Sequence, residues 1–253
     1  MTMKATWRAA IMMAAAGGAA AAQADVFYLN YEAPGVQHST ATFTEVGVET
    51  FDGRPSMRNW TTDFGTGGAV QATYSHVQIN NADQYGGVGG TGQYAVAFNS
   101  TPYSLQFTSD PKRLPHGVNY FGYWLSALDA GNHVAFYKGG SLVGSLNPGD
   151  VLARLNNNRA YFGNPNPAFA GQNANEPYAF INFYDMTGNF DEVRFTQTTG
   201  GGGYESDNHT VGFYTATGGA PEPSTWALLV TGFGLVGGGL RRKSGSPAGL
   251  TAR

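Results

Sequence analysis

The apolar positions along the chain recur with a period of two in a series of short segments. Residues 26–31 show this alternation, and it returns in residues 92–98 and 103–107. Because successive side chains of a strand point to opposite sides, the alternation predicts strands with one buried face. The same pattern predicts further strands at residues 69–79, 178–184, 190–196 and 210–215.

Other segments complete this picture. Residues 118–125 are uniformly apolar, which predicts a central strand covered on both faces. Residues 133–137 and 142–146 flank the glycine-containing turn 138–141 and therefore predict a hairpin. The sequence NPGD at 147–150 favours the start of one short helix, 151–155. Short strands at this spacing predict an all-β fold, a β-sandwich of jelly-roll type that occupies residues 25–216 as one domain.

Composition supports this fold class. Glycine accounts for 37 of the 253 residues and aromatic residues for 13%, whereas charged residues make up only 12%. Aromatic residues are enriched in strands and glycine in tight turns, so both excesses fit short strands joined by turns.

The first 24 residues have the order of a secretory signal peptide. Lys4 and Arg8 precede an apolar run over residues 9–22, and Ala22-Gln23-Ala24 gives the small-x-small pattern of a cleavage site. This order predicts export and the removal of residues 1–24, with Ala22 and Ala24 at the cleavage site. The alternative is a buried alanine-rich helix.

The other end of the chain carries a second targeting pattern. A glycine-rich linker, residues 217–220, leads into PEPSTWA at 221–227, an apolar run to Leu240 and the basic residues 241–243. The apolar run predicts a short transmembrane helix, and the basic cluster places its C-terminal end in the cytoplasm. Residues 244–253 form a short tail beyond the cluster.

This combination resembles the PEP-CTERM sorting signal in its PEPxxWA variant, here over residues 221–243. The residues that carry the resemblance are Pro221, Glu222, Pro223, Trp226 and Ala227, followed by Arg241, Arg242 and Lys243. The resemblance implies an exported protein of a Gram-negative bacterium, tethered to the inner membrane as a precursor and processed near the PEP motif by exosortase. The mature protein is then expected at the cell surface or outside the cell, among extracellular polysaccharide.

The body of the chain resembles, more loosely, a class of exosortase-dependent surface proteins. The similar stretches are residues 80–96, 118–132, 176–180 and 201–212. No biochemical activity of individual residues follows from this resemblance.

Charge and cysteine content limit the possible partners of the chain and the possible sources of its stability. The net charge is −3, and apart from Glu222 every acidic residue lies in the body, which carries 16 acidic against 8 basic residues. An acidic body without a basic cluster excludes nucleic acid as a partner, since phosphate contacts need clustered Lys and Arg. Because the exported chain has no cysteine, its stability must come from the core or from a bound ion, and structural calcium is one candidate.

The densest polar segment is Tyr204–His209. Glu205 and Asp207 would point to one side of an extended chain, and Asn208 adds a carbonyl oxygen, so the segment offers two or three ligands to calcium. Further ligands would come from Asp83, from Asp129 with Asn132, or from Asp185, if folding brings them near. The alternative is a turn in which Asp and Asn bond to their own backbone.

Aromatic residues in loop-like stretches are candidates for sugar binding, because an aromatic face can stack on the C–H side of a pyranose ring. These candidates are Trp60, Tyr85, Tyr161 and Tyr204. The alternative for each of them is packing within the domain. Trp124 lies in the apolar segment 118–125, and we expect it in the core.

The usual catalytic motifs are missing. Residues 87–92 match G-x-G-x-x-G, but a strand pattern follows instead of a helix, which predicts a hairpin loop. Asp191 and Glu192 are adjacent in a strand and face opposite sides, which does not suit the paired carboxylates of a glycosidase. The histidines lack metal-site spacing, and no G-x-S-x-G sequence occurs. We therefore expect no enzyme activity.

The sequence thus predicts an exported, exosortase-sorted surface or extracellular-matrix protein with a structural or adhesive β-sandwich. One alternative is a carbohydrate-binding module for exopolysaccharide. Another is a glycoside-active enzyme.

Overall fold

The computed structural model describes residues 27–215. The predicted signal peptide with Ala22 and Ala24, the linker 217–220, the sorting signal 221–243 and the tail 244–253 lie outside the described residues. Within residues 27–215, no helix is long and apolar enough to cross a membrane.

The described chain folds into twelve strands, with one α-helix and three short 3₁₀ turns. The strands are β1 (Phe27–Tyr31), β2 (Glu45–Glu49), β3 (Arg58–Thr62), β4 (Val70–Asn81), β5 (Gln93–Ala97), β6 (Tyr103–Ser109), β7 (Tyr120–Ser126), β8 (Asn132–Lys138), β9 (Ser141–Leu146), β10 (Ala179–Asp185), β11 (Glu192–Gln197) and β12 (Tyr204–Phe213). The helical elements are α1 (Pro148–Leu155), η1 (Val88–Gly90), η2 (Arg159–Tyr161) and η3 (Pro167–Phe169).

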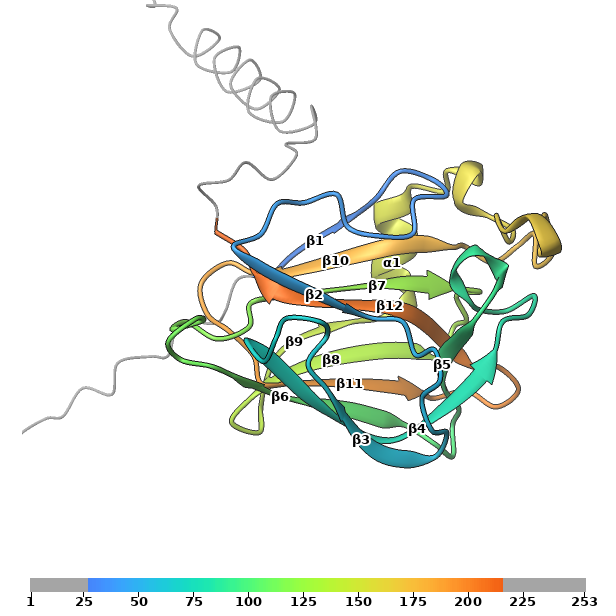
Figure 1. Ribbon diagram of the computed structural model, residues 1–253. Helices are drawn as coiled ribbons and strands as arrows, with labels where there is room; N and C mark the ends of the chain where they lie inside the picture. The colour runs from blue at the N-terminus through green and yellow to red at the C-terminus, as the bar shows by residue number, and fades with distance from the viewer. Residues whose placement is uncertain (1–26, 216–253) are drawn as a thin grey trace, which may run out of the picture.

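The strands form two antiparallel layers (Figure 1). The first layer has the order β1-β10-β7-β12, with β5 and β2 sharing the far edge of β12. The second layer has the order β4-β6-β11-β8-β9, with β3 on the outer edge of β4. If the eight strands from β5 to β12 are renumbered 1 to 8, the first layer has the order 1-8-3-6 (β5-β12-β7-β10). The second layer then has the order 2-7-4-5 (β6-β11-β8-β9).

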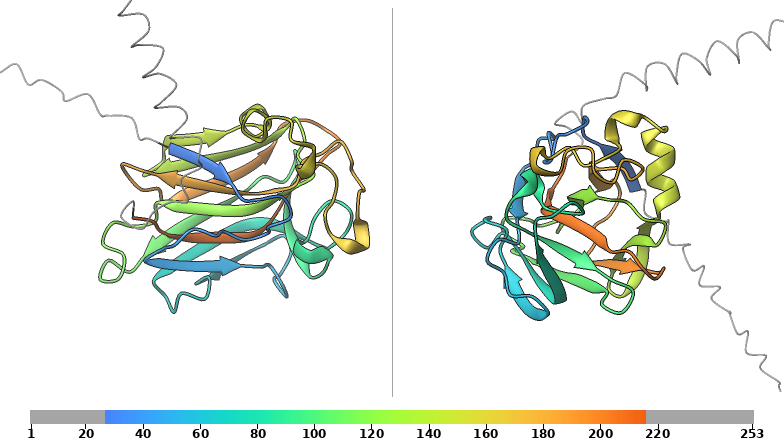
Figure 2. Two further views of the ribbon diagram at one scale, coloured as in Figure 1. Left: turned by 90° about the horizontal axis from the view of Figure 1, so that it is seen from above. Right: turned by 90° about the vertical axis from the view of Figure 1, so that its right-hand side faces the viewer.

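Strand β4 joins the two layers. Its residues 70–75 pair with β6, and its residues 78–81 pair with β5. Between these stretches His76 adopts a positive φ of 48°, which bends the strand from one layer into the other. The sheet therefore wraps around its core and is nearly a barrel, as the end-on view of Figure 2 shows.

The open side of this near-barrel lies between β1 and β9, the two ends of the sheet. The strands come close there: a Cβ on Gly144 of β9 would lie 2.8 Å from the ring of Phe27 of β1. Helix α1 packs here and adds Val151 and Leu155 to the core between the layers. Asn147 caps the helix by accepting a hydrogen bond from the amide of Asp150, whose carboxylate accepts one from Asn147 in return.

The first layer is covered on both faces. Every residue of β7 and of β10 is buried. On the outer face, the segment between β1 and β2 crosses these strands: Glu32 accepts a hydrogen bond from Asn182 at 2.9 Å, and the Phe43 ring lies 4.3 Å from that of Tyr120. The prediction of a central strand covered on both faces, with Trp124 buried, is confirmed.

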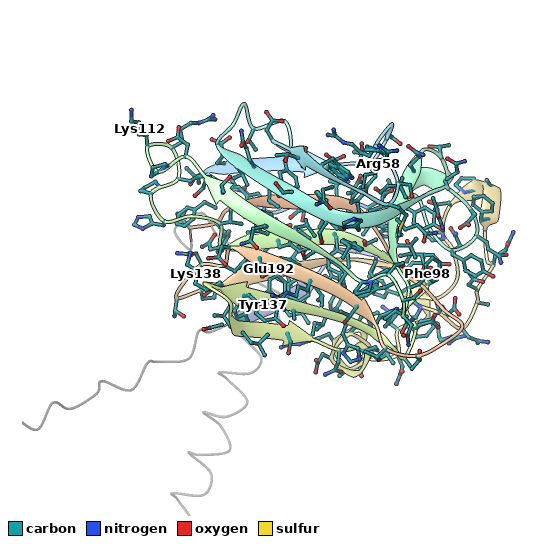
Figure 3. The ribbon with its side chains drawn as sticks, turned by 90° about the horizontal axis from the view of Figure 1, so that it is seen from below. Arg58, Phe98, Lys112, Tyr137, Lys138 and Glu192 are labelled. Carbon is teal, nitrogen blue, oxygen red and sulfur yellow. The ribbon has the colours of Figure 1, made fainter. Side chains whose placement is uncertain are left out.

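The second layer has a polar outer face, seen in Figure 3. Arg194 lies 4.0 Å over the ring of Tyr137 and donates to Glu192 at 2.6 Å. In β4 the exposed and buried residues alternate, as expected of a strand with one solvated face. The two outer faces thus differ, and only that of the first layer is covered by other parts of the chain.

Strand β12 contains a bulge. The register with β7 shifts between Asp207 and Thr210, and Asn208 adopts a positive φ of 47°. The extra residue keeps Ser206 and His209 on the core side while Glu205 and Asp207 face the outer side of the layer. The side chain of Asn208 donates to the carbonyl of Gln37 at 3.0 Å, which ties the bulge to the covering segment.

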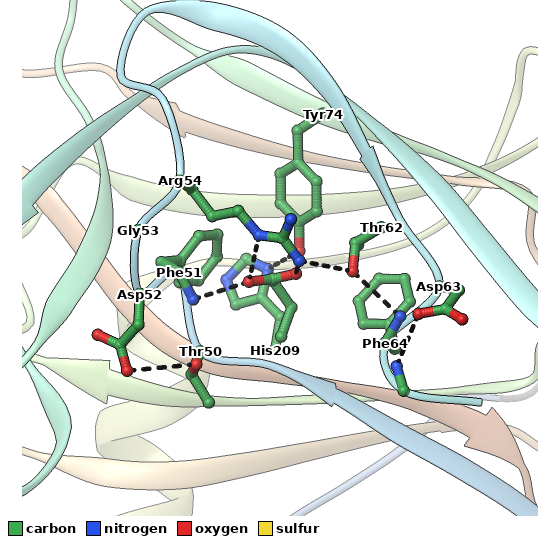
Figure 4. A network of polar contacts seen from close by, with 12 residues as sticks. Thr50, Phe51, Asp52, Gly53, Arg54, Thr62, Asp63, Phe64, Tyr74 and His209 are labelled. Atoms are coloured by element: carbon green, nitrogen blue, oxygen red, sulfur yellow. Dashed lines mark hydrogen bonds and ion pairs between the residues drawn. The ribbon is translucent and has the colours of Figure 1, made fainter. Parts of the chain in front are cut away.

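His209 is the centre of a polar network in the core, and Figure 4 shows it beside one of its partners, Tyr74. Its Nδ1 lies 3.0 Å from the Tyr74 hydroxyl, and its Nε2 lies 3.0 Å from Oγ of Ser206, which in turn lies 2.7 Å from the Tyr103 hydroxyl. Complete burial holds the pKa of His209 well below its usual value, so the imidazole is neutral.

We expect His209→Ala to lower the free energy of unfolding by about 3 kcal/mol. The change opens a cavity among packed rings and leaves the hydroxyl of Tyr74 without its partner. Urea unfolding of the purified protein measures the loss. The exposed His38→Ala serves as control and should change stability by less than about 0.5 kcal/mol. Equal small effects of both variants would show that the network does not support the fold.

Candidate functional site

A cavity of about 500 Å³ opens at one end of the first layer. It lies where the loops that follow β4 and β7 meet the loops that precede β10 and β12. Its size is that of a small-molecule site. The lining residues are Asn80, Asp83, Tyr85, Tyr94, Phe98, Ala127, Asp129, Glu176, Gly201, Gly202, Gly203 and Glu205.

Four carboxylates line this cavity, and they come from four different segments of the chain. They belong to Asp83, Asp129, Glu176 and Glu205, and the lining includes no Lys, Arg or His. Each ion pair within residues 27–215 involves other acidic residues. The cavity therefore concentrates negative charge without a protein counter-charge.

Glu205 is the most deeply buried of the four, with 6% of its surface exposed. It lies in β12 between Ser126 of β7 and Val96 of β5. Burial, reinforced by the neighbouring carboxylates, raises the pKa of Glu205 to about 8. Within residues 27–215, the only hydrogen-bond donor to its carboxylate is its own backbone amide. Glu205 is therefore largely protonated at neutral pH when the cavity holds no ligand.

Two consecutive glycines make room for two of the carboxylates. A Cβ on Gly202 would overlap Oδ2 of Asp129, and a Cβ on Gly203 would overlap Oε1 of Glu205. Any other residue at these positions would displace the carboxylates from the backbone. The glycines before β12 therefore allow the two carboxylates to lie directly against the backbone.

Asp83 is the one carboxylate of the four that the protein holds firmly. It accepts hydrogen bonds from the amides of Tyr85 and Gly86 and from the Tyr94 hydroxyl at 3.1 Å. These bonds also fix the phenol of Tyr94 in the cavity wall. Tyr85 is 45% exposed and lines the cavity from the same loop.

Glu176 and Asp129 resemble Glu205 in their lack of donors. Oε2 of Glu176 is buried without a hydrogen-bond partner, and no side chain or amide within residues 27–215 donates to the carboxylate of Asp129. Burial raises the pKa of both groups, and the charge of Asp129 adds to the shift at Glu176. Asp129 also lines a second cavity of about 470 Å³ beside α1.

Two of the four predicted sugar-binding aromatics are not exposed, and for them the prediction is wrong. Tyr204 lies in β12 with 1% exposure, and its hydroxyl contacts that of Tyr123. Tyr161 is 5% exposed, and its hydroxyl donates to the carbonyl of Glu32. Both rings pack inside the domain, because the segments that looked like loops are a strand and a covered 3₁₀ turn.

The other two aromatics differ from each other. Trp60 lies in β3, where its ring stacks on Tyr74 at 4.3 Å and under Arg54 at 4.9 Å, so its surface is used in packing. Tyr85 remains exposed and lies at the cavity. It is the predicted ligand-contact residue that the structure brings to the candidate site.

The calcium ligand set is not assembled as the sequence suggests. Glu205 and Asp207 do face the same side, but Asp207 accepts hydrogen bonds from the amides of Val88 and Asn208, each at 2.7 Å, outside the cavity lining. Asn208 binds Gln37 instead. Within residues 27–215, no three His, Cys, Asp or Glu side chains converge closely enough to hold a metal ion.

Two of the carboxylates that line the cavity with Glu205 are among the residues that the sequence suggests might come near it. Asp83 and Asp129 were named as residues that folding might bring to Glu205, and it does so. Glu176 was missed as a carboxylate of the site, because a single acidic residue in a loop carries no spacing signal. The segment Tyr204–His209 is part of β12 and not a turn, although Asp207 does accept a hydrogen bond from the adjacent backbone amide of Asn208, as the turn alternative expects.

Comparison with known proteins gives no match to the chain among protein-family models, curated proteins or solved structures.

We expect Glu205→Gln to remove a pH-dependent penalty on folding. The folded state holds a proton on Glu205 that the unfolded state has lost above pH 4.5, so stability falls as pH rises through this window. The difference in unfolding free energy between Glu205→Gln and the wild type should grow by roughly 1 kcal/mol per pH unit from pH 5 to pH 8.

Chemical unfolding at a series of pH values measures this difference. Asp63→Asn, at an exposed carboxylate, is the matched control and should follow the wild-type curve. Parallel curves for Glu205→Gln and the wild type would show that Glu205 titrates as an ordinary, solvated carboxyl.

Proposed function

We propose that the chain is an exported, exosortase-sorted protein of the cell surface or extracellular matrix, and that its β domain is a structural or adhesive module without enzyme activity. The observation that carries the sorting part is the order of signals at the two ends, residues 1–24 and 221–243. The observation that carries the adhesive part is the acidic cavity on the first layer.

We assign the domain to the jelly-roll class of β-sandwiches. Support comes from the order 1-8-3-6 and 2-7-4-5 of strands β5–β12, which two interleaved Greek keys produce. Lectin domains are among the proteins built on this fold. Fold alone does not assign a function, so the sugar-binding role is argued from the cavity.

A carbohydrate-binding role is favoured by where the cavity draws its residues from. The four stretches that resemble exosortase-dependent surface proteins, residues 80–96, 118–132, 176–180 and 201–212, supply every lining residue except Phe98. Polar groups that lack partners, next to an exposed tyrosine, suit a ligand that is both ring-shaped and rich in hydrogen-bond donors. Extracellular polysaccharide is the partner that this chemistry favours.

One observation also favours a glycoside-active enzyme as the second candidate. A carboxyl whose pKa is raised to about 8, beside a second carboxylate, is the arrangement of a general acid with its partner. Release of reducing ends from polysaccharide that depends on both Glu205 and Asp129 would establish that activity. The binding proposal expects no release by the wild type.

Replacement of Pro221-Glu222-Pro223 by three alanines tests the sorting proposal. If exosortase processes the chain near this motif, the variant should remain in the inner membrane as the full-length precursor. Fractionation and immunoblotting of cells that express both forms measure the outcome. Surface levels equal to those of the wild type would contradict the proposal.

Tyr85→Ala tests the carbohydrate-binding proposal. Loss of one stacked ring should weaken binding to a retained glycan about tenfold, as measured on a glycan array followed by calorimetry. Tyr137→Ala, on the outer face of the second layer, is the control and should leave the affinity unchanged. Equal affinities of all three proteins, or no retained glycan, would refute a sugar site at this cavity.

A further inference from the structure

We propose that the acidic cavity binds an amino sugar with a free, protonated amino group, as a unit of a polysaccharide. The inference rests on the proposed carbohydrate-binding role and names the class of sugar. Four carboxylates line this cavity, and no basic side chain from residues 27–215 lines it with them. The carboxylates belong to Asp83, Asp129, Glu176 and Glu205.

Charge favours a cationic sugar over the other common classes. An anionic polysaccharide would be repelled by the carboxylates of Asp83, Asp129 and Glu176, and a neutral sugar would leave their charge uncompensated. A positively charged ligand favours the ionised carboxylates and removes the cost of burying them together. The acidic cavity therefore selects a cation.

Hydrogen bonding points to the same ligand. Glu205 is 6% exposed, lines the cavity and, within residues 27–215, receives only its own amide as donor. Oε2 of Glu176 is buried without a partner. Buried acceptors of this kind require a donor, and an ammonium group supplies three donors and no acceptor.

The geometry favours an organic cation over a metal ion. No three acidic or histidine side chains within residues 27–215 converge on one point, and about 500 Å³ is far more room than an ion fills. Phe98 and the exposed Tyr85 provide aromatic surface for a ring and for cation–π contact.

Binding of such a cation should release a proton. The carboxyl of Glu205 faces Asp83, Asp129 and Glu176 and the phenols of Tyr94 and Tyr178, and no basic side chain lines the cavity. The empty site thus keeps a proton on Glu205, and an ammonium ion beside the carboxylate lowers its pKa and displaces that proton.

Isothermal titration calorimetry of the mature protein tests the inference. The probes are a glucosamine tetramer, an N-acetylglucosamine tetramer and spermidine, in two buffers that differ in ionisation enthalpy. The titrations are done at pH 5.5, where the amino groups are protonated before they bind. We expect the glucosamine tetramer to bind at least tenfold more tightly than either other probe, with release of about one proton. Glu205→Gln should abolish the proton release and weaken binding at least tenfold, whereas Asp63→Asn should match the wild type.

Each other outcome overturns a defined part of the account. Equal or tighter binding of the N-acetylated tetramer without proton release would overturn the amine but leave a sugar site. Spermidine binding as tight as the glucosamine tetramer would overturn the sugar. If no probe binds while the chain still reaches the surface, the inference fails and the surface role stands.

Discussion

The pairing of β12 along both of its edges is the constraint on which the rest of the structure depends. On one side it is bonded to β7, and on the other to β5 and then to β2. Because of the bulge at Asn208, this one strand places side chains both in the core and in the cavity on the outer side of the layer. On its core side His209 joins the hydroxyls of Tyr74 and Ser206, and on its outer side Glu205 closes the acidic cavity. Because β12 is paired along both edges, its backbone cannot shift at either residue without disturbing the neighbouring strands.

The cavity departs from the usual environment of carboxylates in protein interiors. Buried polar groups are normally hydrogen-bonded, and buried carboxylates are normally paired. Within residues 27–215, neither Glu205 nor Glu176 is paired with a cation, and Oε2 of Glu176 is also without a hydrogen-bond partner. The conformationally costly glycines 202 and 203 keep room for two of the carboxylates. Proteins tolerate such unfavourable arrangements chiefly at functional sites, where a ligand supplies the missing partner. Protonation of Glu205 limits the cost until that ligand arrives.

The fold was largely predictable from periodicity, and the exceptions have physical causes. Strand β2 was missed because its pattern is inverted: Val46 and Val48 are 44% and 43% exposed, whereas Glu49 is buried in a salt bridge with Arg54. Strand β3 was missed because its sequence, RNWTT, is mostly polar.

The site was less predictable than the fold, because polar residues in a buried strand do not show the apolar alternation that predicts strands. The polar segment Tyr204–His209 resembles a turn, but carboxylates and amides can occupy a central strand when remote loops cover them. Only the topology brings Asp83, Asp129 and Glu176 to Glu205. The spacing of residues within one segment does not reveal which residues from distant segments line the same cavity.

The most direct test of this account is the titration of the Glu205 side-chain carboxyl by NMR, with the carboxyl carbon observed from pH 3 to pH 10. The account predicts a midpoint near pH 8 in the free protein, and a shift to lower pH when the glucosamine tetramer saturates the cavity. A midpoint near 4.5 in the free protein would contradict the central claim, because it would show a carboxylate that is solvated or already paired.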